Sequence, residues 1–214
     1  EILDVSDLAD KSREIIKGTL VDDDGMIMKI SSSAGGARAK ALIGWDRVND
    51  QFIAGTHKIP SNYQYWMIKF DGTEDGNPLG YGRIEFAYSL MLRECGIEAA
   101  ETYLLEERDR AHFMIKRFDR DEDGNKIHMA SLAGLIHSNY NEPQTTSYRE
   151  FLETIHELTS DMSQVKEGFR RMVFNIIARN QDDHVKNFSF LMNKEGEWAQ
   201  GLTFYRGILF RSSK

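Results

Sequence analysis

Between an apolar helical segment and a strand-like segment, the chain reads Asn180-Gln-Asp-Asp-His-Val-Lys-Asn187. Two residues of this stretch, Asp182 and Asn187, stand five positions apart. A carboxylate and an amide oxygen at this spacing suit phosphoryl transfer, because the first accepts a hydroxyl proton and the second holds a metal ion beside the phosphate. The pattern D-x-x-x-x-N also arises often by chance, so a solvated loop of helix-ending polar residues is the alternative interpretation.

The segments on either side divide into a strand-rich half and a helix-rich half. Apolar residues at helical spacing, such as Ile84, Ala87 and Tyr88, predict helices, and short apolar runs bounded by polar turns predict strands. We expect helices over residues 4–18, 84–95, 148–159 and 165–179, and strands over 26–30, 39–45, 51–58, 65–70, 102–106, 112–118, 188–191 and from 198 onward. The sequence therefore predicts an α+β fold without an internal repeat.

The composition is that of an ordinary globular chain. Its 214 residues are 41% hydrophobic and carry a formal net charge of −7, which argues against disordered and collagen-like classes. The scattered Lys and Arg residues argue against direct nucleic-acid binding, and no apolar run approaches the roughly 20 residues that span a membrane. The single cysteine, Cys95, excludes an intrachain disulfide and is compatible with a reducing compartment. Because the chain begins at Glu1 without a methionine, we expect a part of a longer protein.

A stretch of small residues, Ser33-Ala-Gly-Gly-Ala-Arg-Ala-Lys40, stands between two predicted strands. Gly35, Gly36 and Ala37 let backbone amides approach an anion closely. The stretch lacks the Walker pattern and precedes no predicted helix, so a P-loop is not expected. The alternative interpretation is a glycine-rich hairpin turn.

Two charged residues follow this stretch in the chain. Lys69 stands in a predicted strand, and Glu85 stands at the start of the next predicted helix. A strand lysine that meets a helix glutamate and nucleotide phosphates is a kinase feature. The alternatives are an edge or solvent-facing lysine and an ordinary first-turn acid. The order of glycine-rich loop, strand lysine, helix glutamate and D-x-x-x-x-N favours a two-lobed kinase, because chance agreement of four elements in sequence is improbable.

At this point the sequence resembles a known family. The segment from Asp182 to Leu191 is similar to the D-x-H-x-K-N-F-S signature of HipA-type kinases, the toxins of bacterial toxin–antitoxin pairs. Residues 33–40, 67–69 and 114–120 resemble other blocks of that family in the same order. The resemblance implies a two-lobed kinase-like fold, with a β-rich nucleotide-binding lobe over residues 1–118 and a helical lobe over 119–214 that is incomplete at its C-terminus.

The resemblance also implies an activity, cofactors, partners and a location. It implies serine/threonine phosphorylation with ATP and Mg²⁺, typically of an aminoacyl-tRNA synthetase. A DNA-binding, HipB-like antitoxin would be the partner, and the chain itself would be cytoplasmic, without contact to nucleic acid or membrane.

The same resemblance assigns roles to the residues of the 180–187 stretch. Asp182 corresponds to the catalytic base and Asn187 to a metal ligand. His184 and Lys186 match the motif and are expected to order the loop or touch phosphate.

The first half of the chain would bind the nucleotide. Lys69 would hold the α and β phosphates and pair with Glu85, and the main chain from Lys116 to Phe118 would meet adenine, with Phe118 against the ring. The glycine-rich loop would contribute Ser33, Gly35, Gly36 and Ala37. Ser33, with Ser31 as a second candidate, corresponds to an autophosphorylation site, where added charge would oppose phosphate binding.

One position departs from the family. HipA-like proteins carry a second metal-binding aspartate after the catalytic loop, and here Arg206 stands in its place. Because a cation opposes Mg²⁺, we expect impaired activity in this chain. A non-catalytic, pseudokinase-like module that binds nucleotide or an antitoxin is therefore an alternative. A metal-dependent hydrolase built on Asp182, Asp183 and His184 is a remoter one.

Overall fold

The computed structural model describes residues 2–17, 40–71, 80–138, 146–180 and 183–202. The predicted strand over 26–30, the glycine-rich residues 31–39, Asp182 and Arg206 lie outside the described residues. The chain forms two compact units, here called the first unit (residues 1–87 and 101–125) and the second unit (residues 88–100 and 126–214). The functional division at residue 118 stays a prediction.

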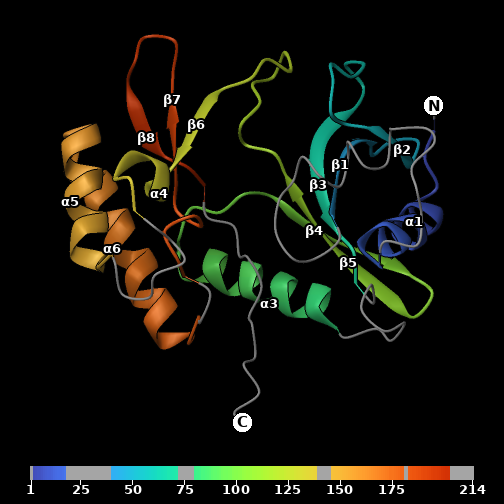
Figure 1. The fold of residues 1–214 in the computed structure, drawn as a ribbon, viewed down its shortest axis with the longest axis horizontal. Helices are drawn as coiled ribbons and strands as arrows, with labels where there is room; N and C mark the ends of the chain where they lie inside the picture. Colours follow the sequence, from blue (N-terminus) through green and yellow to red (C-terminus); the bar gives the residue numbers. More distant parts are fainter. Residues whose placement is uncertain (1, 18–39, 72–79, 139–145, 181–182, 203–214) are drawn as a thin grey trace. The chain divides into compact units, whose positions relative to one another are not determined.

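The first unit is built on a five-stranded antiparallel sheet with the order β2-β1-β3-β5-β4 (Figure 1). The strands are β1 (Lys40–Asp46), β2 (Gln51–Ala54), β3 (Gln64–Lys69), β4 (Thr102–Glu107) and β5 (Arg110–Lys116). The predicted strand over 51–58 ends earlier, at Ala54, before Gly55, whose added Cβ would lie 2.4 Å from the backbone of Ile43. β3 lies at the centre of the sheet.

Aromatic and aliphatic side chains form the core of this unit. Helix α1 (Val5–Lys17) contributes Leu8 and Ala9, which are buried against the sheet. Trp45 on β1 lies edge-on to Trp66 on β3, with ring centroids 5.3 Å apart. Aromatic and branched residues favour strands because they fill a pleated, buried surface.

The N-terminal end of helix α3 (Tyr81–Glu94) packs closely against the sheet. A Cβ added at Gly82 would lie 1.8 Å from the carbonyl oxygen of Ala111 on β5, so only glycine permits this approach. The helix ends before Gly96, which has a φ of +67°, the left-handed conformation common after helices. The N-terminal half of α3, which carries Glu85, is thereby fixed beside the sheet.

The second unit combines helices with a small sheet. Its helices are α4 (Leu132–Leu135), α5 (Tyr148–Thr159) and α6 (Met162–Ile177), and its three-stranded sheet has the order β6-β7-β8. The strands are β6 (His128–Ser131), β7 (Ser189–Met192) and β8 (Trp198–Gln200). The predicted helices over 148–159 and 165–179 and the strands from 188 and 198 are present, whereas β6 and α4 were not predicted.

The core of the second unit joins these elements. Phe151 and Ile155 on α5, Leu132 on α4 and Phe190 on β7 are buried together. Among the described helices, none is long and apolar enough to cross a membrane.

Candidate functional site

Lys69 and Glu85 form a buried ion pair inside the first unit. The Nζ of Lys69 lies 3.0 Å from Oε2 of Glu85, and the two side chains are 5% and 2% exposed. Because β3 is central, the edge or solvent-facing interpretation of Lys69 is wrong. Glu85 lies beyond the first turn of α3, so the first-turn interpretation is wrong as well. The predicted pairing is confirmed.

The burial of this pair has a cost that favours a functional role. Moving a charge out of water costs several kcal/mol per ion, and the mutual attraction of the two charges often does no more than offset that cost. A sheet stabilised only by packing does better with apolar residues at such positions. Buried, paired ionisable groups are therefore common at functional sites.

A second lysine lies next to the pair. Lys40 is directly opposite Lys69 on the neighbouring strand β1 and is 7% exposed. Directly opposite residues of an antiparallel pair share one face of the sheet. Two lysine side chains on one face are hydrogen-bond donors of the kind that suits phosphate oxygens.

His112 ties the chain just beyond Lys69 to the rest of the sheet. The backbone N–H of Asp71 donates to Nδ1 of His112 at 3.0 Å, and Nε2 lies 3.2 Å from Oε2 of Glu107. Since Nδ1 accepts, the proton of the neutral ring resides on Nε2, which donates to Glu107. Burial lowers the pKa of His112, and the charge of Arg110 acts in the same direction. Glu107 and Asp71 act to raise this pKa but do not outweigh burial.

This lowered pKa predicts a loss of stability at mildly acidic pH. The unfolded His112 takes up a proton near its ordinary pKa of 6.5, while the folded ring does so only at lower pH. The free energy of unfolding is therefore expected to fall as pH drops below 6.5, with a slope of up to about 1.4 kcal/mol per pH unit. Urea unfolding at pH 7.5, 6.5 and 5.5 measures it.

The matched comparison is His112→Gln, which keeps a hydrogen-bonding side chain but does not titrate. Its slope between pH 6.5 and 5.5 is expected to be smaller than that of the wild type, whereas His137→Gln, at an exposed position, keeps the wild-type slope. Equal slopes for the wild type and His112→Gln contradict the role of His112.

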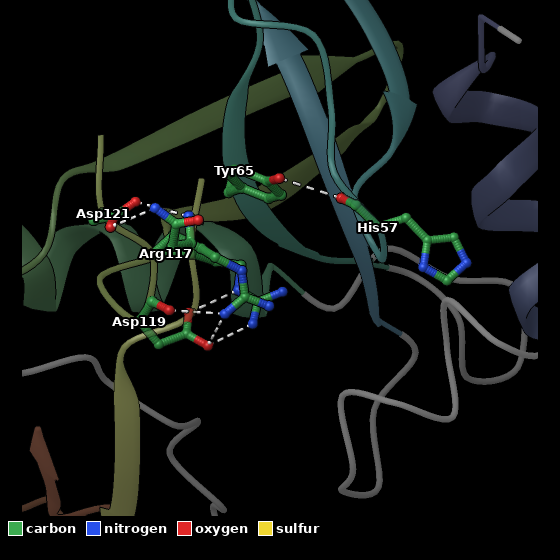
Figure 2. A network of polar contacts seen from close by, with 7 residues as sticks. His57, Tyr65, Arg117, Asp119 and Asp121 are labelled. Atoms are coloured by element: carbon green, nitrogen blue, oxygen red, sulfur yellow. Dashed lines mark hydrogen bonds and ion pairs between the residues drawn. The ribbon is translucent and has the colours of Figure 1, made fainter. Parts of the chain in front are cut away.

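The segment that follows β5 is held by a charged cluster (Figure 2). Two nitrogens of Arg117 donate to the Asp119 carboxylate at 2.8 and 2.5 Å, and Arg120 donates to it at 2.8 Å. Burial acts to raise the pKa of Asp119, but the hydrogen bonds and charges of the two arginines outweigh it and lower that pKa. Tyr65 adds rigidity because its hydroxyl donates to the His57 carbonyl at 3.2 Å.

This cluster fixes the segment that is predicted to bind adenine. Two backbone N–H groups of that segment already donate hydrogen bonds to other backbone carbonyls. The N–H of Lys116 donates to the Glu101 carbonyl at 2.8 Å, and that of Arg117 donates to the Tyr65 carbonyl at 2.9 Å. An adenine contact through these two amides is therefore excluded. The roles of Lys116 and Phe118 in binding adenine stay predictions.

In the second unit, the segment from Asp183 to Phe188 is held at several points. The carbonyls of Val185 and Phe188 accept from the N–H groups of Ala133 and Leu132 at 3.1 and 2.9 Å. Within the segment, the Asn187 N–H donates to the His184 carbonyl at 2.8 Å, and the Lys186 N–H donates to Nδ1 of His184 at 3.3 Å. His184 therefore orders the loop, one of the two roles expected for it.

The oxygen atoms near Asn187 bear on the predicted metal. Asn187 and Asp183 line a cavity of about 30 Å³ in this unit. The Tyr148 hydroxyl donates to the Asp183 carboxylate. Among the described residues, no group of three or more His, Cys, Asp or Glu side chains is placed to hold a metal ion. Asn187 offers an amide oxygen of the kind Mg²⁺ prefers. The metal-dependent hydrolase stays an alternative, because Asp182 lies outside the described residues.

Solved structures place the fold in a kinase-like class. The chain is similar to HipA in the complex of HipA, HipB and operator DNA from Shewanella oneidensis MR-1, with a TM-score of 0.65, 16% identity, and coverage of 97% of this chain and 50% of that chain. It is also similar to the proinflammatory kinase CtkA of Helicobacter pylori, with a TM-score of 0.50, 17% identity, and coverage of 66% of this chain and 50% of that chain. The similarity of this mixture of helices and antiparallel sheet to these two structures confirms the predicted fold class.

The family follows from the sequence match. The model of the HipA-like C-terminal domain matches residues 32–203, so the chain belongs to that family. A curated Haemophilus influenzae protein named "Putative kinase" is 29% identical over 123 residues, which cover 51% of this chain and 36% of that protein. The chain thus spans half or less of the length of these relatives.

Sequence reasoning missed several polar residues that the structure brings to these sites. Lys40 is the last residue of the glycine-rich stretch, but its place opposite Lys69 depends on strand register. Tyr148 and Asn175 gave weaker signals. Asn175 interrupts the apolar run Met172-Val-Phe-Asn-Ile-Ile-Ala178, and Tyr148 is the second residue of a Ser147-x-x-Glu150 capping pattern.

Proposed function

We propose that this chain is the nucleotide-binding part of a HipA-type serine/threonine protein kinase that uses ATP and Mg²⁺. The buried Lys69–Glu85 pair is the observation that carries the proposal. In protein kinases a strand lysine holds the nucleotide phosphates and a helix glutamate orients it. Membership of the HipA-like family supports the same assignment.

The residues have distinct tasks in this proposal. Glu85 fixes the ammonium group of Lys69, and Lys69 and the glycine-rich loop hold the phosphates. Asp182 accepts the proton of the attacking hydroxyl, and Asn187 provides an oxygen ligand to the metal. The metal, when bound, neutralises phosphate charge and so lowers the barrier to transfer.

The protein substrate and the partner are the finer part of the proposal. A hydroxyl of a protein such as an aminoacyl-tRNA synthetase would receive the phosphate. A HipB-like DNA-binding antitoxin would be the partner, as the Shewanella oneidensis complex of HipA with HipB and operator DNA suggests for a relative. The net charge of −7 is consistent with DNA contact by that partner rather than by this chain.

Phosphate transfer from γ-labelled ATP tests the proposal. The chain is expected to incorporate acid-stable label in the presence of Mg²⁺ and not in EDTA, and the label is expected on Ser33 or Ser31. It should be lost from the double variant Ser31→Ala/Ser33→Ala but not from Ser163→Ala on α6. Label that appears equally in EDTA, or that spreads over residues independent of Ser31 and Ser33, contradicts the assignment.

A non-catalytic module that binds nucleotide or antitoxin is the second candidate. Arg206 favours it, because a cation stands where the family has a metal-binding aspartate. ATP affinity that does not depend on Mg²⁺, together with an absence of label, is the result that selects this alternative.

A further inference from the structure

One tyrosine contacts both ends of the segment that carries Asn187. The hydroxyl of Tyr148 donates to Oδ2 of Asp183, where the segment begins. The ring of Tyr148 lies edge-on to Phe188, where the segment ends, with centroids 6.2 Å apart. Phe188 in turn lies 4.3 Å from Phe151, centroid to centroid. Asn187 is thus next to a residue that α5 holds in place.

The hydroxyl of Tyr148 belongs to a chain of hydrogen bonds with a single direction. Nδ2 of Asn180 donates to Oδ1 of Asn175 at 3.2 Å. The Asn175 side chain hydrogen-bonds to the Tyr148 hydroxyl, and that hydroxyl donates to Asp183. Burial, and next the bond to Asp183, raise the pKa of Tyr148, so the hydroxyl keeps its proton and stays a donor. The chain therefore ends on the Asp183 side chain as acceptor.

The two middle groups of this chain, Tyr148 and Asn175, stand on helices. Tyr148 is the first residue of α5, where the side chain and backbone of Ser147 and Glu150 form a reciprocal capping box. Asn175 lies near the end of α6 and is 9% exposed. Side chains on capped, packed helices hold a loop more firmly than loop residues do.

We propose that the hydrogen-bond chain Asn180–Asn175–Tyr148–Asp183 is a positioning device that fixes the segment 183–188 and, through it, the amide oxygen of Asn187. This inference rests on the proposed function, because it gives the fixed segment the task of holding the metal–nucleotide complex. Asp183 and Tyr148 are positioning residues here, and neither touches the reacting atoms. They set how strongly Mg²⁺ and nucleotide binding are coupled.

Tyr148→Phe is the sharpest test, since it keeps the ring contacts and removes only the hydroxyl. Loss of a hydrogen bond to a charged group is expected to speed amide hydrogen exchange of residues 184–187 roughly 10- to 100-fold. Exchange in the core of α5 is expected to stay as in the wild type. Tyr103→Phe, at a half-exposed position of β4, is the matched control. It is expected to change neither the exchange of residues 184–187 nor the exchange in the core of α5.

The same variants separate positioning from a purely structural role. In Tyr148→Phe the gain in ATP affinity that Mg²⁺ provides is expected to shrink, while affinity in EDTA stays unchanged. Asp183→Asn keeps an acceptor for the Tyr148 hydroxyl. Its Mg²⁺-dependent gain in ATP affinity is therefore expected to be closer to that of the wild type than the gain in Asp183→Ala.

Two results overturn the inference. One is exchange of residues 184–187 at the wild-type rate in Tyr148→Phe, and the other is faster exchange with undiminished Mg²⁺ coupling. If the wild type binds no ATP at all, the proposed function fails on its own. The exchange rates then decide whether the hydrogen-bond chain holds the segment.

Discussion

Asp182→Asn is expected to slow phosphate transfer from ATP by about 10²- to 10⁴-fold, the usual contribution of a general acid–base group. Asparagine has nearly the same shape as aspartate but cannot accept the hydroxyl proton. ATP affinity is expected to change little, because in this proposal Asp182 faces the hydroxyl rather than the phosphates. Initial rates of label incorporation from γ-labelled ATP measure the ratio.

The control for this prediction removes a carboxylate elsewhere. Asp109→Asn lies at an exposed position in the turn between β4 and β5 and is expected to keep the wild-type rate. The wild-type rate itself is expected to be low, since Arg206 stands at the second metal position. Equal rates for the wild type and Asp182→Asn contradict the role of Asp182 as catalytic base.

Glu85→Ala is expected to lower the free energy of unfolding of the first unit by about 3–5 kcal/mol, the usual effect of breaking a buried ion pair. The substitution removes the carboxylate that lies 3.0 Å from Nζ of Lys69, a group that is 5% exposed. The charge of Lys69 then stays buried without that partner. Urea unfolding followed by tryptophan fluorescence measures the loss, because Trp45 and Trp66 lie in the first unit.

Arg83→Ala on the same helix is the matched control. Arg83 pairs with Glu106 at 2.5 Å, but the side chains are 53% and 62% exposed. Exposed pairs contribute about 0–1 kcal/mol, so Arg83→Ala is expected to change stability by no more than that. A loss as small for Glu85→Ala as for Arg83→Ala contradicts the buried, functional character of the Lys69–Glu85 pair.

Local signals in the sequence predicted much of this fold. The apolar spacing over residues 148–159 predicts α5, and the structure has that helix over Tyr148–Thr159, with Ser147 and Glu150 as a capping box. The apolar runs around Lys69 and Met114 predict β3 and β5, which pair in the sheet. Local patterns are reliable where a long element has both a clear period and a clear boundary.

What the sequence could not supply are the contacts between distant segments. The burial of Lys69 depends on the central position of β3 in the sheet. A local sequence pattern does not predict the order of strands. The bond from Tyr148 to Asp183 joins positions 35 apart in the chain. The elements β6 and α4 have four residues each, too few to show a period.

The residues predicted for the candidate site divide in the same way. The order of motifs along the chain predicted the pairing of Lys69 with Glu85, because kinases use that pair in a fixed place. The structure adds that the amides of Lys116 and Arg117 are occupied within the sheet, which no pattern of residue types reveals.

Affinity for ATP with Mg²⁺ and in EDTA, measured by isothermal titration calorimetry on this chain, is the most direct test of a kinase-type nucleotide site. We predict that the chain binds one ATP and that Mg²⁺ strengthens this binding at least tenfold, about 1.4 kcal/mol. Lys69→Met is expected to abolish ATP binding. Lys194→Met, in the exposed turn before β8, is expected to leave ATP binding intact. Equal affinities in the two conditions, or binding that survives in Lys69→Met, would contradict it.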